Sequence, residues 1–318
     1  SGKRPKRMAE TGSLASPAIR AYTSAYIRDL LERYPQITGF RPDWPEYPCY
    51  MLEEAFQDFA PHVKVWAESR GFDFERMRAE AGRLFDHLHG RLTTVDLRQL
   101  AAPDYGPSAR VDLMQHFPAV LGWLQLKRVL SVDLLRHWRE SITAAGGNDK
   151  ELSANAFMPP LSHLTGFDFS AAATHCDAVS PKLFTMHWSA MVEFWGAELL
   201  HHNPALDEQV LVSALANLFD LGDSTAPRVV ADFGYPEPHE AHPIPDDRQA
   251  RRIGQVQAEV NGGCRVTPIV HGYGPFDDFC RRFRVAADNA PDGLWVNRYG
   301  YLSDQKMDAV RQIWEDGP

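Results

Sequence analysis

Apolar and polar positions alternate along this chain in stretches with helical spacing and stretches with strand character. The first clear pattern runs from Ser16 to Tyr34, where apolar side chains recur three or four positions apart, which predicts a helix. Ser16 is suited to cap this helix and Pro17 to occupy its first turn. The positions that carry the spacing are Ile19, Tyr22, Tyr26, Leu30 and Tyr34. A short apolar run from Ile37 to Phe40 follows and predicts a strand.

The segment after this strand is polar, aromatic and rich in proline. Pro42, Pro45 and Pro48 hold it in a non-helical conformation, because proline cannot continue a helix and restricts the residue before it. A helix, a strand and then a loop of charged and aromatic residues form the repeating unit of an α/β barrel, which presents its chemistry at the carboxyl end of each strand. The chain therefore predicts functional residues between positions 41 and 50.

A long helical region comes next. Its apolar spacing predicts helices over Met51 to Ser69, over Phe72 to His89, and one or two more over Val111 to Ala145. The pair Gly146 and Gly147 is a helix stop. We expect residues 51–147 to be a helical insertion that follows the first strand, which is a usual position for a lid or a substrate-shaping subdomain.

Strand and helix patterns alternate through the remainder of the chain. Strands are predicted over Leu152 to Met158, Asp177 to Met186, Arg265 to Val270 and Gly293 to Asn297. Helices are predicted over Phe169 to His175, Ser189 to His202, Asp207 to Leu221, Arg248 to Asn261, Phe276 to Asn289 and Asp304 to Trp314. Between them, Gly222 to Asp247 carries five prolines and is expected to be a loop.

This order predicts parallel strands joined by crossover helices. The fold we expect is α/β of the (β/α)8 TIM-barrel type, with only strands four to eight evident and with a helical insertion. In this view residues 1–50 hold a barrel helix, a strand and the catalytic loop, residues 51–147 the insertion, and residues 148–318 the remaining β/α units. The first three strands would come from an upstream segment, from a partner segment or from a second copy of the chain. The alternative is a smaller open α/β sheet.

Composition narrows the classes of partner. The 318 residues carry a formal net charge of -9, which argues against a nucleic-acid partner because phosphate binding needs clustered Lys and Arg. No apolar stretch approaches the roughly 20 residues that span a bilayer, and no signal peptide is evident, so we expect no membrane partner. The four cysteines form no CxxC pair and are expected to be buried thiols. Composition leaves the cellular compartment undecided.

The order and spacing of the five strand ends resemble strands four to eight of glycoside-hydrolase-like TIM-barrel proteins. Uncharacterised glycosyl-hydrolase-like proteins pair a Ser-Pro-x-x-Arg-x-Tyr helix with a G-(I/F)-x-x-D strand end. The matching positions here are Ser16, Pro17, Arg20, Tyr22, Gly39, Phe40 and Asp43. The strand end also partly resembles the DGxDxDxE motif and following Tyr of family 18 chitinases, through Gly39, Phe40, Asp43, Trp44, Glu46 and Tyr47. Thr38 and Arg41 replace two acids of that motif, and Pro45 adds a residue. The resemblance implies a hydrolase acting on carbohydrate.

Asp43 and Glu46 are the close carboxylate pair at a predicted strand end. Glycoside hydrolysis usually needs one protonated and one ionised carboxyl group, and proximity together with Trp44 would push one pKa upward. We expect Asp43 to act as nucleophile or stabiliser and Glu46 as general acid and base. The alternative for Glu46 is a salt bridge to Arg41 or a helix cap.

Residues at the predicted strand ends are candidates for substrate contacts. We expect the substrate-binding set to be Arg41, Trp44, Lys182, His187, Trp188, His271, Tyr273, Asn297, Arg298 and Tyr301. Lys182 lies on a strand between apolar neighbours, where it would be costly unless it reaches a carboxylate such as Asp43 or extends to solvent. The guanidinium of Arg298 suits a carboxylate or sulfate of an acidic glycan.

Two other functions stay open. A metal-dependent hydrolase would use His187 and His271, joined by Asp43, but no HxH pair follows a strand. A non-catalytic carbohydrate-binding protein would keep the aromatic residues without the chemistry. Neither a GxGxxG nor a P-loop motif is present, so no nucleotide cofactor is expected, and we expect no metal.

Overall fold

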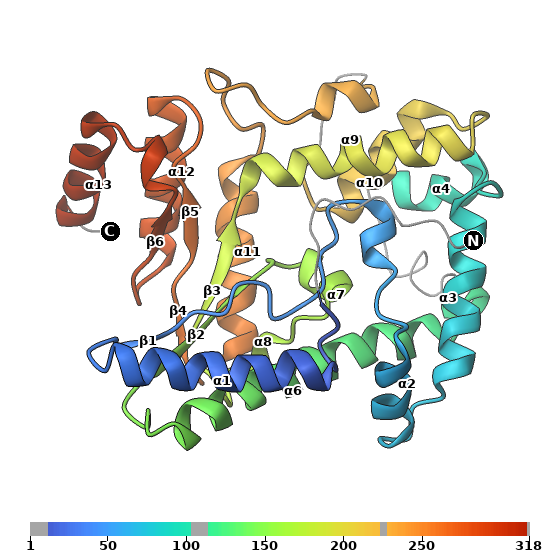
Figure 1. Ribbon diagram of the computed structural model, residues 1–318. Coiled ribbons are helices and arrows are strands. Elements are labelled where there is room, and N and C mark those ends of the chain that lie inside the picture. Colours follow the sequence, from blue (N-terminus) through green and yellow to red (C-terminus); the bar gives the residue numbers. More distant parts are fainter. Residues whose placement is uncertain (1–11, 103–113, 223–227, 317–318) are drawn as a thin grey trace.

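The computed structural model describes residues 12–102, 114–222 and 228–316. Its strands form one parallel sheet in the order β1-β2-β3-β5-β6, with β4 also paired to β3 (Figure 1). The strands are β1 Gly39–Phe40, β2 Glu151–Ala156, β3 Ala178–Leu183, β4 Arg265–Val266, β5 Ile269–His271 and β6 Trp295–Asn297. Every pairing is parallel, so the predicted α/β architecture with crossover connections is confirmed.

One predicted strand is divided in two. The run from Arg265 to Val270 forms β4 and β5, which pair with successive parts of β3 on either side of Pro268. Proline has no N–H to give to a ladder, which explains the break at this position. The carbonyl oxygen of Pro268 still accepts a hydrogen bond of 2.8 Å from the backbone N of Trp295, so the register continues into β6.

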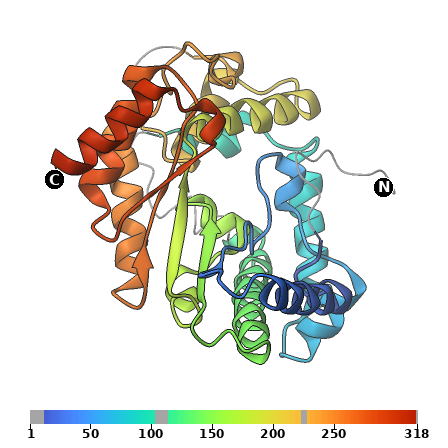
Figure 2. The same ribbon diagram turned by 60° about the vertical axis from the view of Figure 1, so that its left-hand side comes forward.

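A continuous layer of helices covers one face of the sheet. It consists of α1 Pro17–Arg33, α6 Val120–Ala144, α8 Phe169–Ala172, α11 Asp246–Val260, α12 Phe276–Asn289 and α13 Asp304–Asp316, and each packs against the next in this order (Figure 2). Phe40, Leu152, Ala154 and Val179 point into the apolar cluster beneath this layer. With its helices on one face, the sheet is a parallel half-barrel.

The sheet is strongly curved. The guanidinium carbon of Arg41, which follows β1, lies 3.8 Å from the ring centre of Trp295 in β6. These two strands are the ends of the five-strand path, and four steps in a flat sheet would place them about 19 Å apart. Curvature therefore brings the two edges within reach of each other's side chains across the concave face.

Helix α1 confirms the predicted cap but buries a different face. The Ser16 side chain accepts a hydrogen bond from the backbone N of Ile19, and Pro17 occupies the first turn. The buried residues are Thr23, Ile27 and Leu31, because α1 packs along one narrow face against α6. Most of the positions that carried the predicted spacing are exposed, namely Ile19, Tyr22, Tyr26 and Tyr34.

The region after β1 is helical, as predicted, with different boundaries. It contains the 3-10 turn η1 Leu52–Ala55, followed by α2 Pro61–Glu68, α3 Phe74–Leu88 and α4 Thr94–Ala101, before α6. The helix predicted over Met51 to Ser69 is divided because Pro61 can begin a helix but cannot lie inside one. The helix predicted from Val111 is described from Val120 in α6, and Val111 itself lies outside the described residues.

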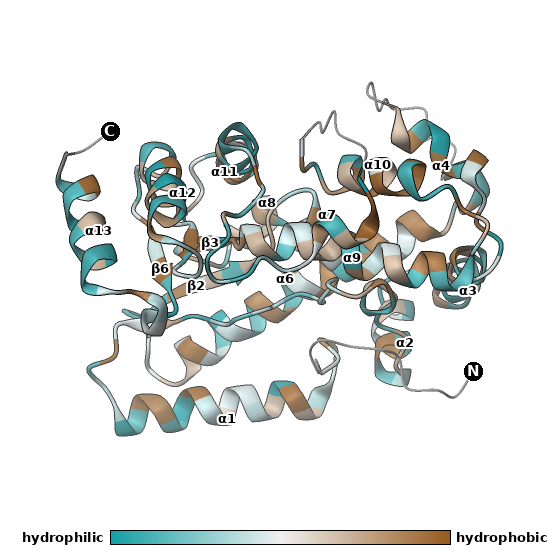
Figure 3. Ribbon diagram, turned by 90° about the horizontal axis from the view of Figure 1, so that it is seen from above, coloured by the Kyte–Doolittle hydropathy of each residue, from teal (hydrophilic) through white to brown (hydrophobic). Residues whose placement is uncertain are grey.

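The connection from β3 to β4 contributes many residues to the largest apolar cluster of the described part of the chain. Helix α9 Thr185–His202 begins directly after β3, α10 Glu208–Leu218 follows it, and the turn η2 Val230–Phe233 packs on α9. The remaining short elements are α7 Leu161–Thr165, after β2, and η3 Tyr299–Tyr301, after β6. Figure 3 shows hydrophobic residues gathered on α9 and α10, whereas α11 and α13 are mainly hydrophilic.

Candidate functional site

The carboxyl ends of β1, β3, β5 and β6 bring polar and aromatic side chains together at one edge of the curved sheet. We call this group the mouth, and its members are Asp43, Trp44, Tyr50, Lys182, His187, Tyr235, His271, Tyr273, Arg298 and Tyr301. They are linked by ring contacts and charge interactions described below. The position agrees with the general rule that parallel α/β proteins bind ligands beyond the carboxyl ends of their strands.

An ion pair lies at the centre of the mouth. The Nζ of Lys182 is 2.7 Å from Oδ1 of Asp43, and the lysine side chain is 3% exposed whereas that of Asp43 is 64% exposed. Burial lowers the pKa of Lys182, and Asp43 opposes that shift. The ammonium also lies 4.8 Å from the ring centre of Trp44, which is close enough for a cation–π interaction. A buried lysine thus holds a carboxylate that faces solvent.

The local backbone explains where Asp43 points. Its main chain forms an isolated parallel bridge with Asn155 of β2, which extends the β1–β2 pairing past the end of β1. Arg41 donates a 2.9 Å hydrogen bond from Nη2 to Oδ1 of the same asparagine. Trp44 has a positive φ of 56°, an uncommon conformation for a large side chain. The chain therefore turns sharply once Asp43 has left the sheet.

Glu46, the predicted partner of Asp43, lies beneath the mouth. It is fully buried, and its carboxyl group accepts a 2.6 Å hydrogen bond from the backbone N of Phe157 and a short one from Oγ1 of Thr165. Burial raises the pKa of Glu46 to about 8, against the opposing effects of Thr165, Lys182 and the Phe157 amide. These contacts tie the segment after β1 to the residues after β2, and they favour an anchoring role over direct contact with a substrate.

Two neutral histidines form the next part of the mouth. His187 lies in the first turn of α9, and its Nδ1 is 3.1 Å from the hydroxyl oxygen of Tyr50. His271 ends β5, and its Nδ1 accepts a 3.1 Å hydrogen bond from the backbone N of Tyr273, which leaves the ring proton on Nε2. Burial, together with nearby cations that include Arg298, lowers the pKa to about 4 for His187 and to about 3 for His271.

Aromatic rings connect these histidines into one wall. The ring centres of Tyr235 and Tyr273 are 5.4 Å apart, and so are those of Tyr273 and Tyr301. Tyr235 lies 5.7 Å from His187, and Tyr301 lies 5.8 Å from His271. Such ring faces bury the apolar side of a ligand while their hydroxyl groups bind its polar edge.

Tyr50 and Tyr235 were not among the predicted binding residues. Both lie in proline-rich loops, Tyr50 after Pro48 and Tyr235 immediately before Pro236. An aromatic side chain in a loop beside proline was the available signal. It did not identify these two residues, because their loops come from distant parts of the chain and meet only after folding.

Of the predicted binding residues, Trp188 lies away from the mouth, whereas Asn297 is a direct neighbour of it in the sheet. Trp188 follows His187 in sequence but lies on another face of α9, where it is 2% exposed and its ring centre is 3.7 Å from the guanidinium carbon of Arg252. Asn297 pairs with His271 in the sheet, and its backbone carbonyl accepts a hydrogen bond of 3.0 Å from the N of Gly272.

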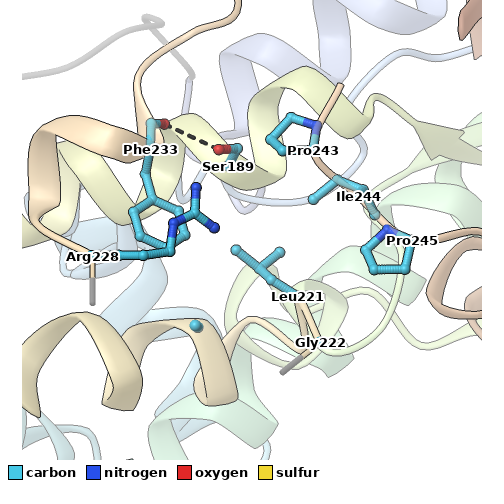
Figure 4. A pocket seen from close by; sticks show the side chains of 9 residues that line it. Ser189, Leu221, Gly222, Arg228, Phe233, Pro243, Ile244 and Pro245 are labelled. Carbon is cyan, nitrogen blue, oxygen red and sulfur yellow. Dashed lines mark hydrogen bonds between the residues drawn. The ribbon is translucent and has the colours of Figure 1, made fainter. Parts of the chain in front are cut away.

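A cavity of about 350 Å³ borders the Asp43 side of the mouth. Its wall includes Arg41, Asp43 and Trp44, and Leu134 and Trp138 of α6 lie opposite. This volume falls at the lower end of the range for small-molecule sites. A smaller cavity of about 150 Å³ is lined in part by Ser189 of α9, and Figure 4 shows Arg228 and Phe233 near this residue.

Two further observations bear on the predicted partners. Across the described residues, His187, His271 and Asp43 do not form a group with the mutual distances of metal ligands. A separate search of those residues finds no helix with the length and apolar character to cross a bilayer. Comparisons of the sequence with protein-family models and with characterised proteins give no match.

Proposed function

We propose that this protein is a glycoside hydrolase that binds carbohydrate in the mouth, on a fold of the (β/α)8 TIM-barrel type. The observation that carries the proposal is the exposed Asp43 carboxylate, which the buried Lys182 holds in place at a strand end beside an aromatic wall. The half-barrel sheet and its single helix layer support the barrel type, in which active sites lie at the carboxyl ends of the strands.

The mouth has the chemistry that a sugar ring needs. Tyr235, Tyr273 and Tyr301 offer ring faces for the C–H side of a sugar, and the neutral rings of His187 and His271 can exchange hydrogen bonds with its hydroxyl groups. Asp43 is the group that would stabilise positive charge at the sugar carbon under attack, or bond to it as nucleophile.

A second carboxyl group is needed to protonate the leaving oxygen. Glu46 is enclosed by its own hydrogen bonds, so we assign this role to Glu237, which is exposed in the loop that follows Tyr235. Burial raises the pKa of Tyr273, one ring of the wall, and the charge of Glu237 contributes to the same shift. The Tyr273 hydroxyl donates a 2.8 Å hydrogen bond to the carbonyl of Pro236 and so holds this loop against the mouth.

The test is hydrolysis of a panel of aryl glycosides and oligosaccharides by the wild type and three variants, with and without a chelator. We expect Asp43→Asn and Glu237→Gln to lose turnover by a hundredfold or more, on the order of the factor that one positioned acid or base contributes. Glu46→Gln should keep most of the activity. Loss of turnover in Asp43→Asn and Glu46→Gln but not in Glu237→Gln would return the role of acid to the predicted pair, and loss on chelation would favour the metal-dependent alternative.

A second candidate is a carbohydrate-binding protein without catalysis. The burial of Glu46 favours it, because only one carboxylate of the predicted pair is accessible. In that case calorimetry would detect sugar binding without turnover, and Asp43→Asn would bind nearly as tightly as the wild type.

A further inference from the structure

Three potential metal ligands meet where α3 ends beside the carboxyl end of α9. His89 caps the end of α3, while Glu198 and His202 lie one turn apart on α9 (Figure 1). One ligand atom from each residue lies within 4.8 Å of the other two, and all three side chains are partly buried. Within the described residues this is the one group of His, Cys, Asp or Glu with such distances.

His89 is already arranged as a metal ligand. Its Nδ1 is 2.8 Å from the carbonyl oxygen of Phe85, and a carbonyl can only accept, so Nδ1 carries the proton. The lone pair then resides on Nε2, which is buried and has no hydrogen-bond partner. Metal-binding histidines commonly donate their other ring N–H to a backbone carbonyl in this way, which fixes the tautomer and the ring orientation.

Glu198 and His202 have nearly the separation that a metal requires. Nε2 of His202 lies 3.1 Å from Oε1 of Glu198. Tetrahedral coordination with bonds of about 2.1 Å places neighbouring ligand atoms roughly 3.4 Å apart. The rings of His89 and His202 have centres 4.7 Å apart, and the three ligand atoms, which lie within 4.8 Å of one another, would have to draw closer when a metal binds.

A buried asparagine holds these elements in register. Asn203 donates a 2.7 Å hydrogen bond from Nδ2 to the carbonyl of Leu88, and its Oδ1 accepts a 3.0 Å hydrogen bond from the backbone N of Leu92. The loop that carries His89 is therefore fixed against the end of α9 without a metal. Little conformational ordering remains to oppose binding, which favours affinity.

We propose that His89, Glu198 and His202 bind one zinc ion that fastens the end of α3 to α9. Two imidazoles and one carboxylate suit Zn²⁺ better than Ca²⁺ or Mg²⁺, which prefer oxygen ligands alone, and water would complete the coordination. Fifteen residues of helix, about 22 Å at 1.5 Å each, separate His202 from His187 at the mouth. The site is thus separate from the mouth, and the proposal is independent of the proposed hydrolase activity.

The experiment uses the full chain after treatment with a chelator. Calorimetric titration with Zn²⁺ should give one site per chain, and Co²⁺ should give the visible absorption of a tetrahedral complex. His89→Gln and His202→Gln should each weaken binding by at least a hundredfold. His201→Gln is the matched control, because His201 is an exposed neighbour on the same helix and should bind as the wild type does.

Added zinc should raise the melting temperature of the wild type and of His201→Gln but not that of the other two variants. Absence of a one-to-one zinc site in the wild type would overturn the proposal, as would an equal loss of zinc affinity in all three variants. If either ligand variant fails to fold, nitrogen NMR of the wild type decides. Zinc must then shift the Nε2 resonances of His89 and His202, and unchanged resonances would overturn the assignment.

Discussion

Replacement of Glu46 by glutamine separates an anchoring role from a catalytic one. With a pKa of about 8, Glu46 is mostly protonated at neutral pH in the folded protein. Glutamine has nearly the same shape, so its carbonyl oxygen can accept from the Phe157 amide and its NH₂ group can donate to Thr165 Oγ1. The variant should fold with the same contacts.

The predicted effect on stability depends on pH. The folded-state pKa lies above the value of 4.5 for an unperturbed group, so the folded protein holds a proton that the unfolded chain releases. This contribution is fully present below pH 4.5 and is lost as pH rises towards 8. Each pKa unit corresponds to about 1.4 kcal/mol, so the wild type should lose about 3 kcal/mol relative to Glu46→Gln between pH 5 and pH 7.

Urea denaturation of both proteins at pH 5, 6, 7 and 8, followed by circular dichroism, measures this difference. The free energies of unfolding of the two proteins should be similar at pH 5. That of Glu46→Gln should exceed that of the wild type by a growing amount up to pH 8. Glu46→Ala is the control for lost contacts. It leaves the buried amide of Phe157 without its acceptor, at a cost of about 1–3 kcal/mol plus that of the cavity. A difference in the free energy of unfolding between Glu46→Gln and the wild type that does not change with pH would refute the reasoning.

Two further predictions follow from the described geometry. Gly39→Ala should destabilise the protein by about 1–3 kcal/mol in urea denaturation, because a Cβ would lie 2.5 Å from the backbone oxygen of Glu151. Gly254→Ala in α11 is the control, and it should be neutral or slightly stabilising because the space around Gly254 is open. Equal effects of the two changes on the free energy of unfolding would contradict this account. His187 should titrate near pH 4 in proton NMR, because burial and the charge of Lys182 disfavour its protonation. Lys182→Met should raise the pKa of His187. A wild-type midpoint near 6.5 would show that the ring is solvated.

The sequence identified much of the fold because many of its signals are local. Ser16 and Pro17 mark the start of α1, and the order of strands and helices after Lys150 follows the pattern of apolar residues. The division at Pro268 and the buried face of α1 were not predicted. Both depend on the neighbour that each segment contacts in the folded protein. Thr23 and Ile27, for example, are buried because α6 packs against that face of α1.

The candidate site was predicted in part. Asp43, Lys182, His187 and His271 could be named because residues that end parallel strands meet at one edge of a sheet. The burial of Glu46 could not be read from the sequence, because it depends on Thr165 and on the amide of Phe157, both distant in the chain.

The sequence by itself thus determined the types and order of the elements, and the strand ends that carry polar and aromatic residues. Only the tertiary structure decided that Asp43 faces solvent while Glu46 does not, and that His89 lies beside Glu198 and His202. Caps, turns and periodicity act over a few residues and can therefore be recognised in the sequence. Burial, pKa and ligand geometry are set by neighbours that folding brings together, and these are properties of the packed molecule.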